Sequence, residues 1–236
     1  MNDTRLQELL VDTLAAAEER EAALVALSDD TPSQVEGRWT AKDHLAHLAS
    51  WRMHATRVLT AAHAGDSYPE TDDIDAQNAR TYAVNRDRSA AGILAEADTA
   101  YMDLVMALRA CSDEELQHPR AGRPGPVWRT VPANGHQHVG QHLVQWHLEH
   151  GDRDAAEGIA LWVRELDDRF DDDESRAVAR YNLACFYAQT GVAARALPLL
   201  RESLVMRPSL REWARGDTDL DPVRGDPEVS HLLSPE

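Results

Sequence analysis

The sequence predicts an all-α protein, in which an antiparallel four-helix bundle is followed by a small helical segment. Three observations predict this fold class. The 236 residues include only two phenylalanines beside many alanines, leucines, glutamates and arginines, a composition that favours helices over sheets. Apolar residues recur at helical spacing through most of the chain, and stretches rich in proline and glycine separate these runs. We therefore expect two domains, at residues 1–151 and 152–236.

The first two helices are predicted from apolar spacing and from capping residues. Between Thr4 and Leu27, leucines and alanines recur with acidic residues between them, as an amphipathic helix requires. A turn-like stretch follows at residues 28–39. Thr40 can then cap a second helix that ends at Gly65, and this helix carries the first cluster of histidines.

The remaining bundle helices are expected after an acidic, proline-containing loop at residues 66–75. A short helix is predicted from Ile74 to Asn85, and Ser89 can cap a longer helix through residue 111. Residues 112–128 contain too much proline and glycine to stay helical. A last helix is predicted from Val131 to His150. Four helices with such connections favour an antiparallel bundle, in which facing side chains can form a site.

The C-terminal third carries a pattern of small and large residues typical of a helical hairpin. Its matches are Leu183, Ala184, Tyr187, Gly191, Ala196, Leu200 and Pro208. This spacing resembles the tetratricopeptide (TPR) repeat, although Arg180 stands where the repeat usually has tryptophan. Because one repeat cannot bury its apolar face alone, a helix at residues 155–166 is expected to be an incomplete neighbour. Packing on the bundle or on a second copy in a dimer is favoured over a peptide-binding groove, which needs at least about three repeats.

Charge and cysteine content exclude several classes of function. Acidic residues outnumber basic ones by 41 to 24 and no run of lysine or arginine is present, so neither nucleic acid nor an anionic membrane surface is an expected partner. The first twenty residues carry charges every few positions, unlike a signal peptide or a spanning helix, and a cytoplasmic location is the default expectation. Cys111 and Cys185 are far apart in sequence, which predicts neither a disulfide nor a cysteine-based zinc site.

The histidines are the strongest chemical signal in the sequence. Six of the eleven fall in two short windows, at residues 44–47 and 136–147. His138 and His142 are four residues apart, so on a helix their rings lie on one face and can hold one metal ion. His47 lies on an apolar stretch that should face the bundle interior, and it is the best third ligand. Alternatively, each histidine is a hydrogen-bonded core residue.

Two segments of the first domain carry a family resemblance. They are WTAKDHLAHLASW, with Trp39, Lys42, His47 and Trp51, and NGHQHVGQHLVQW, with Asn134, His138, His142 and Trp146. They resemble the signature segments of the DinB-like superfamily of bacterial four-helix bundles, in particular the ClbS/DfsB-like group. The resemblance covers most of residues 1–150 and implies that His47, His138 and His142 bind a divalent metal such as zinc, nickel or iron.

The expected function is that of a metal-dependent enzyme acting on small electrophilic molecules. Three imidazoles leave a divalent ion with open positions, at which the pKa of a bound water or thiol falls. Water would give a hydrolase. A low-molecular-weight thiol, the cofactor that the resemblance implies, would give S-transfer or isomerisation. The alternative is a non-catalytic scaffold in which the bundle forms a homodimer and the TPR-like tail recruits a protein partner.

Residues around the predicted ligands are assigned less firmly, and no catalytic or cofactor-binding residue is named. Asn134, His44 or Asp43 can orient a ligand by hydrogen bonding. His136 and Asp43 are candidates for a general base. Trp51, Trp128 and Trp146 can wall the pocket, although ordinary core packing is the expected role of each.

Overall fold

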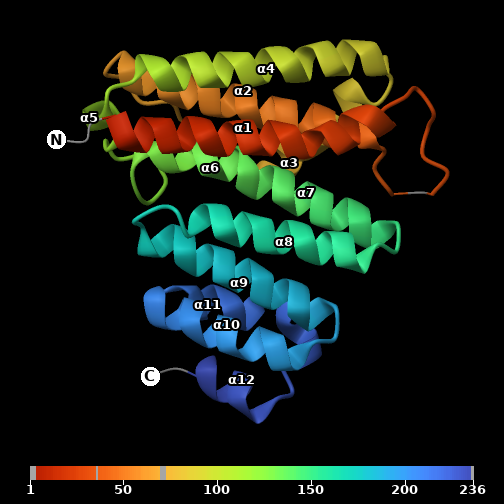
Figure 1. The fold of residues 1–236 in the computed structure, drawn as a ribbon, viewed down its shortest axis with the longest axis vertical. Helices are drawn as coiled ribbons and strands as arrows, with labels where there is room; N and C mark the ends of the chain where they lie inside the picture. Colours follow the sequence, from red (N-terminus) through yellow and green to blue (C-terminus); the bar gives the residue numbers. More distant parts are fainter. Residues whose placement is uncertain (1–3, 36, 70–72, 235–236) are drawn as a thin grey trace. The chain divides into compact units, whose positions relative to one another are not determined.

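The computed structural model describes residues 4–35, 37–69 and 73–234. This part of the chain contains helices and no named strand, so the predicted all-α class is confirmed (Figure 1). The chain divides into two compact units, Met1–His142 and Leu143–Glu236. The predicted domain boundary at residue 151 stays a prediction. Parts of the two predicted loops, at Glu36 and at residues 70–72, lie outside the described residues.

Three long helices form the body of the first unit, in which each packs against the other two (Figure 1). They are α1 (Thr4–Leu27), α2 (Ala41–His63) and α4 (Ala90–Ala110). The core residues of α1 are spaced at helical intervals, and include Leu10, Leu14, Ala17 and Leu24. Where α2 meets α4, the buried residues Ala49, Ala97 and Ala100 have small side chains that let the two helices approach closely.

Two predicted helix caps are confirmed. Thr40 begins α2 with a capping box, in which the Asp43 amide donates to the Thr40 hydroxyl and the Thr40 amide donates to the Asp43 carboxylate. The hydroxyl of Ser89 accepts from the Gly92 amide at the start of α4. The helix α2 ends at His63, two residues before Gly65, whose positive φ of 76° is the left-handed conformation that glycine adopts readily.

The shorter helix α3 (Ile74–Asn85) contributes little to the core, because Asn85 is its single buried residue. It still touches α2 through polar contacts. The indole N–H of Trp51 donates to the Asn78 side chain at 3.0 Å, and the hydroxyls of Ser50 and Thr81 lie 3.3 Å apart. These contacts fix α3 beside the histidine-bearing half of α2.

The last predicted bundle helix, from Val131 to His150, is wrong as one continuous element. After α5 (Asp113–Leu116) and η1 (Val127–Arg129), the chain forms α6 (Thr130–Asn134) and then α7 (His136–Glu149). The break is at Gly135, whose backbone has φ −104° and ψ −119°. A Cβ atom there would lie 2.8 Å from the Val131 carbonyl oxygen and 2.9 Å from a methyl group of Leu14. Glycine therefore permits the close approach that redirects the chain just before His138.

The second unit begins within α7 and continues through α8 (Arg153–Asp167), α9 (Asp173–Gln189) and α10 (Ala193–Met206). The short elements α11 (Leu210–Gly216), η2 (Thr218–Val223) and α12 (Pro227–Leu232) follow. The hairpin of α9 and α10 turns at Gly191, with φ 76°. Ala184, Tyr187, Ala196 and Leu200 are buried in it. The pattern residues therefore form a hairpin core, and membership of the TPR family stays a prediction.

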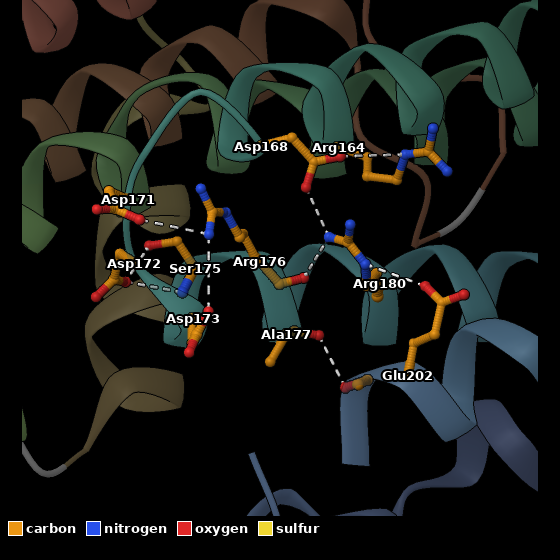
Figure 2. A network of polar contacts seen from close by, with 11 residues as sticks. Arg164, Asp168, Asp171, Asp172, Asp173, Ser175, Arg176, Ala177, Arg180 and Glu202 are labelled. Atoms are coloured by element: carbon orange, nitrogen blue, oxygen red, sulfur yellow. Dashed lines mark hydrogen bonds and ion pairs between the residues drawn. The ribbon is translucent and has the colours of Figure 1, made fainter. Parts of the chain in front are cut away.

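Arg180, which stands where the repeat pattern usually has tryptophan, joins three helices of the second unit (Figure 2). Its guanidinium donates to Asp168 at the end of α8 at 2.7 Å and to Glu202 on α10 at 3.2 Å. The same group reaches the Arg176 carbonyl oxygen one turn back at 3.1 Å. Ionic contacts thus replace an apolar ring at this position.

No helix in the described ranges has the length and apolar content needed to cross a membrane.

Candidate metal centre

Three histidines from two helices converge inside the first unit. His47 extends from α2, and His138 and His142 extend from consecutive turns of α7. The Nε2 atom of His138 lies 3.0 Å from Nε2 of His47 and 3.2 Å from Nε2 of His142. The potential ligand atoms of all three lie within 4.8 Å of one another. The structure therefore brings together the three residues that the sequence singles out.

The spacing of these nitrogens fits a metal ion. Zinc binds histidine at about 2.0–2.1 Å, and two ligands at a tetrahedral angle are then about 3.3 Å apart. The two Nε2 separations of 3.0 and 3.2 Å are close to this value. The donor set contains imidazoles alone, which suit zinc, nickel and iron better than magnesium or calcium.

The histidine cluster is held in its neutral form. Burial, followed by the neighbouring His44, lowers the pKa of His47 to about 4. Burial, then His47 and Arg52, lowers the pKa of His138 to about 3. Burial also holds the pKa of His142 well below its usual value, with smaller effects of the surrounding histidines. At neutral pH the three rings therefore keep the lone pairs that ligation needs.

A layer of aromatic rings covers the cluster. Trp39 stacks on His142 with the ring centroids 5.8 Å apart and the planes at 8°, and its other neighbour in the stack is Tyr82, at 5.9 Å and 8°. Trp39 also contacts His47 at 5.1 Å. The sequence interpretation did not assign Trp39 and Tyr82 to the wall, because these contacts join a loop to the separate helix α3.

Of the three tryptophans considered as walls of the pocket, Trp51 contacts the cluster. Its ring centroid lies 6.4 Å from those of His47 and His138. Trp128 is buried beside the Arg129 guanidinium, and Trp146 stacks on His150, which directly follows α7.

Space beside the cluster is narrow. A pocket with an empty volume of about 180 Å³ borders His47, and it is too narrow for a water molecule. Its lining includes Trp39, Asp43, Thr81, Tyr82 and Asn85. A wider cleft, with an empty volume of about 960 Å³, is lined by Val58, Tyr68 and His118 among others, and none of the three clustered histidines lines it. Access to the cluster through the narrow pocket therefore requires Trp39 or Tyr82 to move.

The residues considered for orienting the ligands differ in their hydrogen-bond partners. Asn134 donates to the Thr130 carbonyl oxygen at 2.8 Å, and Asp43 is engaged in the cap of α2 with Thr40. His44 is the one whose hydrogen bond reaches a member of the cluster, because its Nδ1 lies 2.8 Å from Nδ1 of His142. His136, a candidate general base, is fully buried at the start of α7 and lies outside the converging set.

A second group of possible ligand atoms lies in the other unit, at Cys185, Asp217 and Asp219. Hydrogen bonds account for its arrangement. The Tyr181 hydroxyl donates to Asp217 at 2.6 Å, and the Gln189 amide donates to Asp219 at 2.7 Å. Burial and the two carboxylates raise the pKa of the Cys185 thiol, which keeps it protonated. These contacts tie α9 to η2.

A helical bundle with converging histidines in its interior is the architecture of the DinB-like superfamily, whose members bind divalent metals. Residues 13–134, just over half of the chain, match the family described as the mycothiol maleylpyruvate isomerase N-terminal domain. The chain belongs to this family. The match includes His47 and ends before His138 and His142. No curated protein matches the chain, and no solved structure matches it either.

Proposed function

We propose that the protein is a metal-dependent enzyme that joins a low-molecular-weight thiol to small electrophilic molecules. His47, His138 and His142 are the proposed ligands of a divalent ion. The observation that carries the proposal is that Nε2 of His138 lies within ligand spacing of Nε2 of both His47 and His142, in a group that includes no carboxylate among the described residues. A divalent ion bound by three neutral imidazoles keeps its full charge and an open position, and so lowers the pKa of a thiol or water.

The family supports a thiol over water as the nucleophile. Its description names mycothiol, a low-molecular-weight thiol, together with an isomerase of maleylpyruvate. In the proposed reaction the S–H bond of the thiol breaks and its proton passes to solvent, while the sulfur forms a bond to an electrophilic carbon of the substrate. That carbon releases its leaving group with the bonding electrons, as chloride from an aryl chloride, or, at an activated C=C bond, the displaced electron pair takes up a proton. Hydrolysis is the second outcome that the same ligands allow.

The protein's own residues would supply shielding and orientation. Trp39 and Tyr82 exclude water from one side of the cluster, because their stacked rings and the narrow pocket leave no room for it. His138 is the most exposed of the three histidines. Arg52, which is paired with Glu21 in the bundle core, lies close enough to His138 to disfavour its protonated form.

Metal analysis of the untagged protein is the first test. We expect one divalent ion per chain after loading with zinc or nickel, and loss of that ion in His138→Ala. A matched control is His54→Ala, since His54 is a buried histidine of the same helix α2 that lies outside the cluster. Full metal content in His138→Ala would show that the ligands are assigned wrongly. A wild-type protein that takes up neither metal would overturn the proposal.

The thiol step needs a separate assay. The zinc-loaded protein is incubated with mycothiol and a chromogenic electrophile such as chlorodinitrobenzene, and the thioether is measured against a protein-free blank. We expect faster formation with the wild type and a return to the blank rate in His138→Ala. Turnover of an ester substrate without any thiol would instead assign the hydrolytic reaction.

A second candidate function concerns the C-terminal unit, which we propose recruits a protein partner. Large apolar side chains on it are open to solvent, including Trp213, which is 65% exposed, and Val205, which is 75% exposed. Affinity capture with the full chain and with Trp213→Ala tests this role. A partner retained equally by both proteins would argue against it.

A further inference from the structure

His44 is a fully buried histidine whose ring contacts His142 of the candidate metal centre. It precedes His47 by three residues on α2, so one helix presents two histidines to the same region. Whereas His47 faces His138, the Nδ1 atom of His44 lies 2.8 Å from Nδ1 of His142. The two rings meet edge to face, with centroids 5.0 Å apart and planes at 71°.

This nitrogen pair links the protonation of the two rings. A neutral imidazole has one N–H donor and one acceptor nitrogen, so across the 2.8 Å contact one ring donates and the other accepts. If His142 donates from Nδ1, its Nε2 carries a lone pair directed toward His138. If His44 donates instead, the proton of His142 must be on Nε2, where it blocks ligation.

His142 alone among the three clustered histidines has a protein partner on its outer nitrogen. In the part of the chain that the structure describes, the buried Nδ1 atoms of His47 and His138 have no hydrogen-bond partner. Trp39 completes the enclosure, because it stacks on His142 and meets the His44 ring at 5.4 Å and 63°. The orientation of His142 therefore depends on His44 and Trp39.

We propose that His44 is a positioning residue, which accepts the Nδ1 proton of His142 and thereby holds Nε2 of His142 ready for a metal ion. The inference rests on the proposed metal site and adds a residue to it. His44 then has its own proton on Nε2. Partners that accept the outer N–H of a metal-bound histidine fix its tautomer and ring orientation, and removing one typically weakens metal binding by about 10- to 100-fold.

Two substitutions test separately whether metal binding depends on the acceptor nitrogen of His44 or on the volume of its ring. His44→Leu fills the space without an acceptor, whereas His44→Asn can offer its side-chain oxygen near the position of Nδ1. Zinc affinity is measured by competition with a chelating indicator. We expect binding about 10- to 100-fold weaker in His44→Leu, recovery to within a few-fold of wild type in His44→Asn, and no change in the control His54→Leu.

A direct measurement keeps the test independent of how well the variants fold. In the zinc-loaded wild type, long-range ¹⁵N–¹H NMR of the imidazole rings should find the proton of His142 on Nδ1 and that of His44 on Nε2. A proton on Nε2 of His142, or wild-type affinity in a folded His44→Leu, would overturn the role of His44. Failure of the wild type to bind zinc would instead count against the proposed function.

Discussion

The guanidinium of Arg52 on α2 forms a two-pronged ion pair with the Glu21 carboxylate on α1, and both side chains are almost completely buried. One of the two contacts, from Nη1 to Oε1, measures 3.0 Å. Arg52 also lies near enough to His138 to lower its pKa. The pair is therefore part of the bundle core and part of the electrostatic environment of the histidines.

Breaking this pair should destabilise the protein strongly. Glu21→Leu leaves the Arg52 charge buried without its counter-ion, and the expected loss in the free energy of unfolding is about 3–5 kcal/mol. The double variant Glu21→Leu, Arg52→Met removes both charges and should recover most of this loss. Chemical denaturation measures both effects. Asp87→Asn is the exposed control, because Asp87 is 86% exposed beside Arg86 and should change stability by less than about 1 kcal/mol. Equal losses in the single and double variants would contradict this account.

Gly135 and Gly158 should respond in opposite directions to the same substitution. Gly135→Ala places a Cβ atom 2.8 Å from the Val131 carbonyl oxygen, which should cost about 1–3 kcal/mol and disturb the start of α7. Gly158 is exposed within α8 and has nothing within 4 Å of an added Cβ, so Gly158→Ala should stabilise by about 0.5–1 kcal/mol. Thermal melting checks both changes. A stabilised Gly135→Ala would show that the break between α6 and α7 does not depend on glycine.

This glycine also shows why part of the fold escaped the sequence interpretation. The apolar spacing around Val131 and Leu143 fits one helix, and a glycine within such a pattern is only weakly unfavourable. At the break, the Gly135 backbone lies so close to the Val131 carbonyl oxygen and to Leu14, more than a hundred residues earlier in the chain, that only glycine fits without a clash. By contrast, the starts of α2 and α4 depend on local caps at Thr40 and Ser89, and these caps were predicted.

The candidate site likewise has a part that the sequence predicts and a part that depends on tertiary packing. His138 and His142 are paired by helical spacing, His47 was selected from its apolar surroundings, and family resemblance then implied the ligand role for all three, so the converging set was accessible from the sequence. The direction of His44 was not, because its neighbour along the chain is His47 whereas its hydrogen bond goes to His142, 98 residues away. The cover formed by Trp39 and Tyr82 likewise depends on where α3 packs, which no local pattern encodes.

The thiol of Cys111 should make stability fall at high pH. Burial, with a smaller effect of Glu115, raises its pKa from 9.0 to about 11. The unfolded chain therefore loses this proton first, so the stabilisation is complete below pH 9 and is lost as the pH rises through about 11. The full difference corresponds to about 2–3 kcal/mol. Between pH 8 and pH 11 the free energy of unfolding should fall by about 2 kcal/mol more in the wild type than in Cys111→Ala, and parallel pH profiles would refute the prediction. Both proteins are compared in a Cys185→Ala background, because burial and Asp217 also raise the pKa of the Cys185 thiol.

The stacked ring of Trp39 should slow the loss of a bound metal. Its indole lies against His44, His47 and His142, and the adjoining pocket has no room for water. A chelator or an exchanging water can reach the cluster from this side only after the ring moves. Trp39→Ala should therefore release zinc to excess EDTA about tenfold faster than wild type, because the apolar shell of a metal site controls solvent access.

Trp39→Phe retains an aromatic face, so its release rate should lie between those of the wild type and the alanine variant. Trp213→Ala removes a tryptophan that is 65% exposed in the other unit, and its rate should equal that of the wild type. Stopped-flow measurement with a zinc-sensitive dye gives the three rates. An unchanged rate in Trp39→Ala would show that the stack of Trp39 and Tyr82 is not a barrier to exchange.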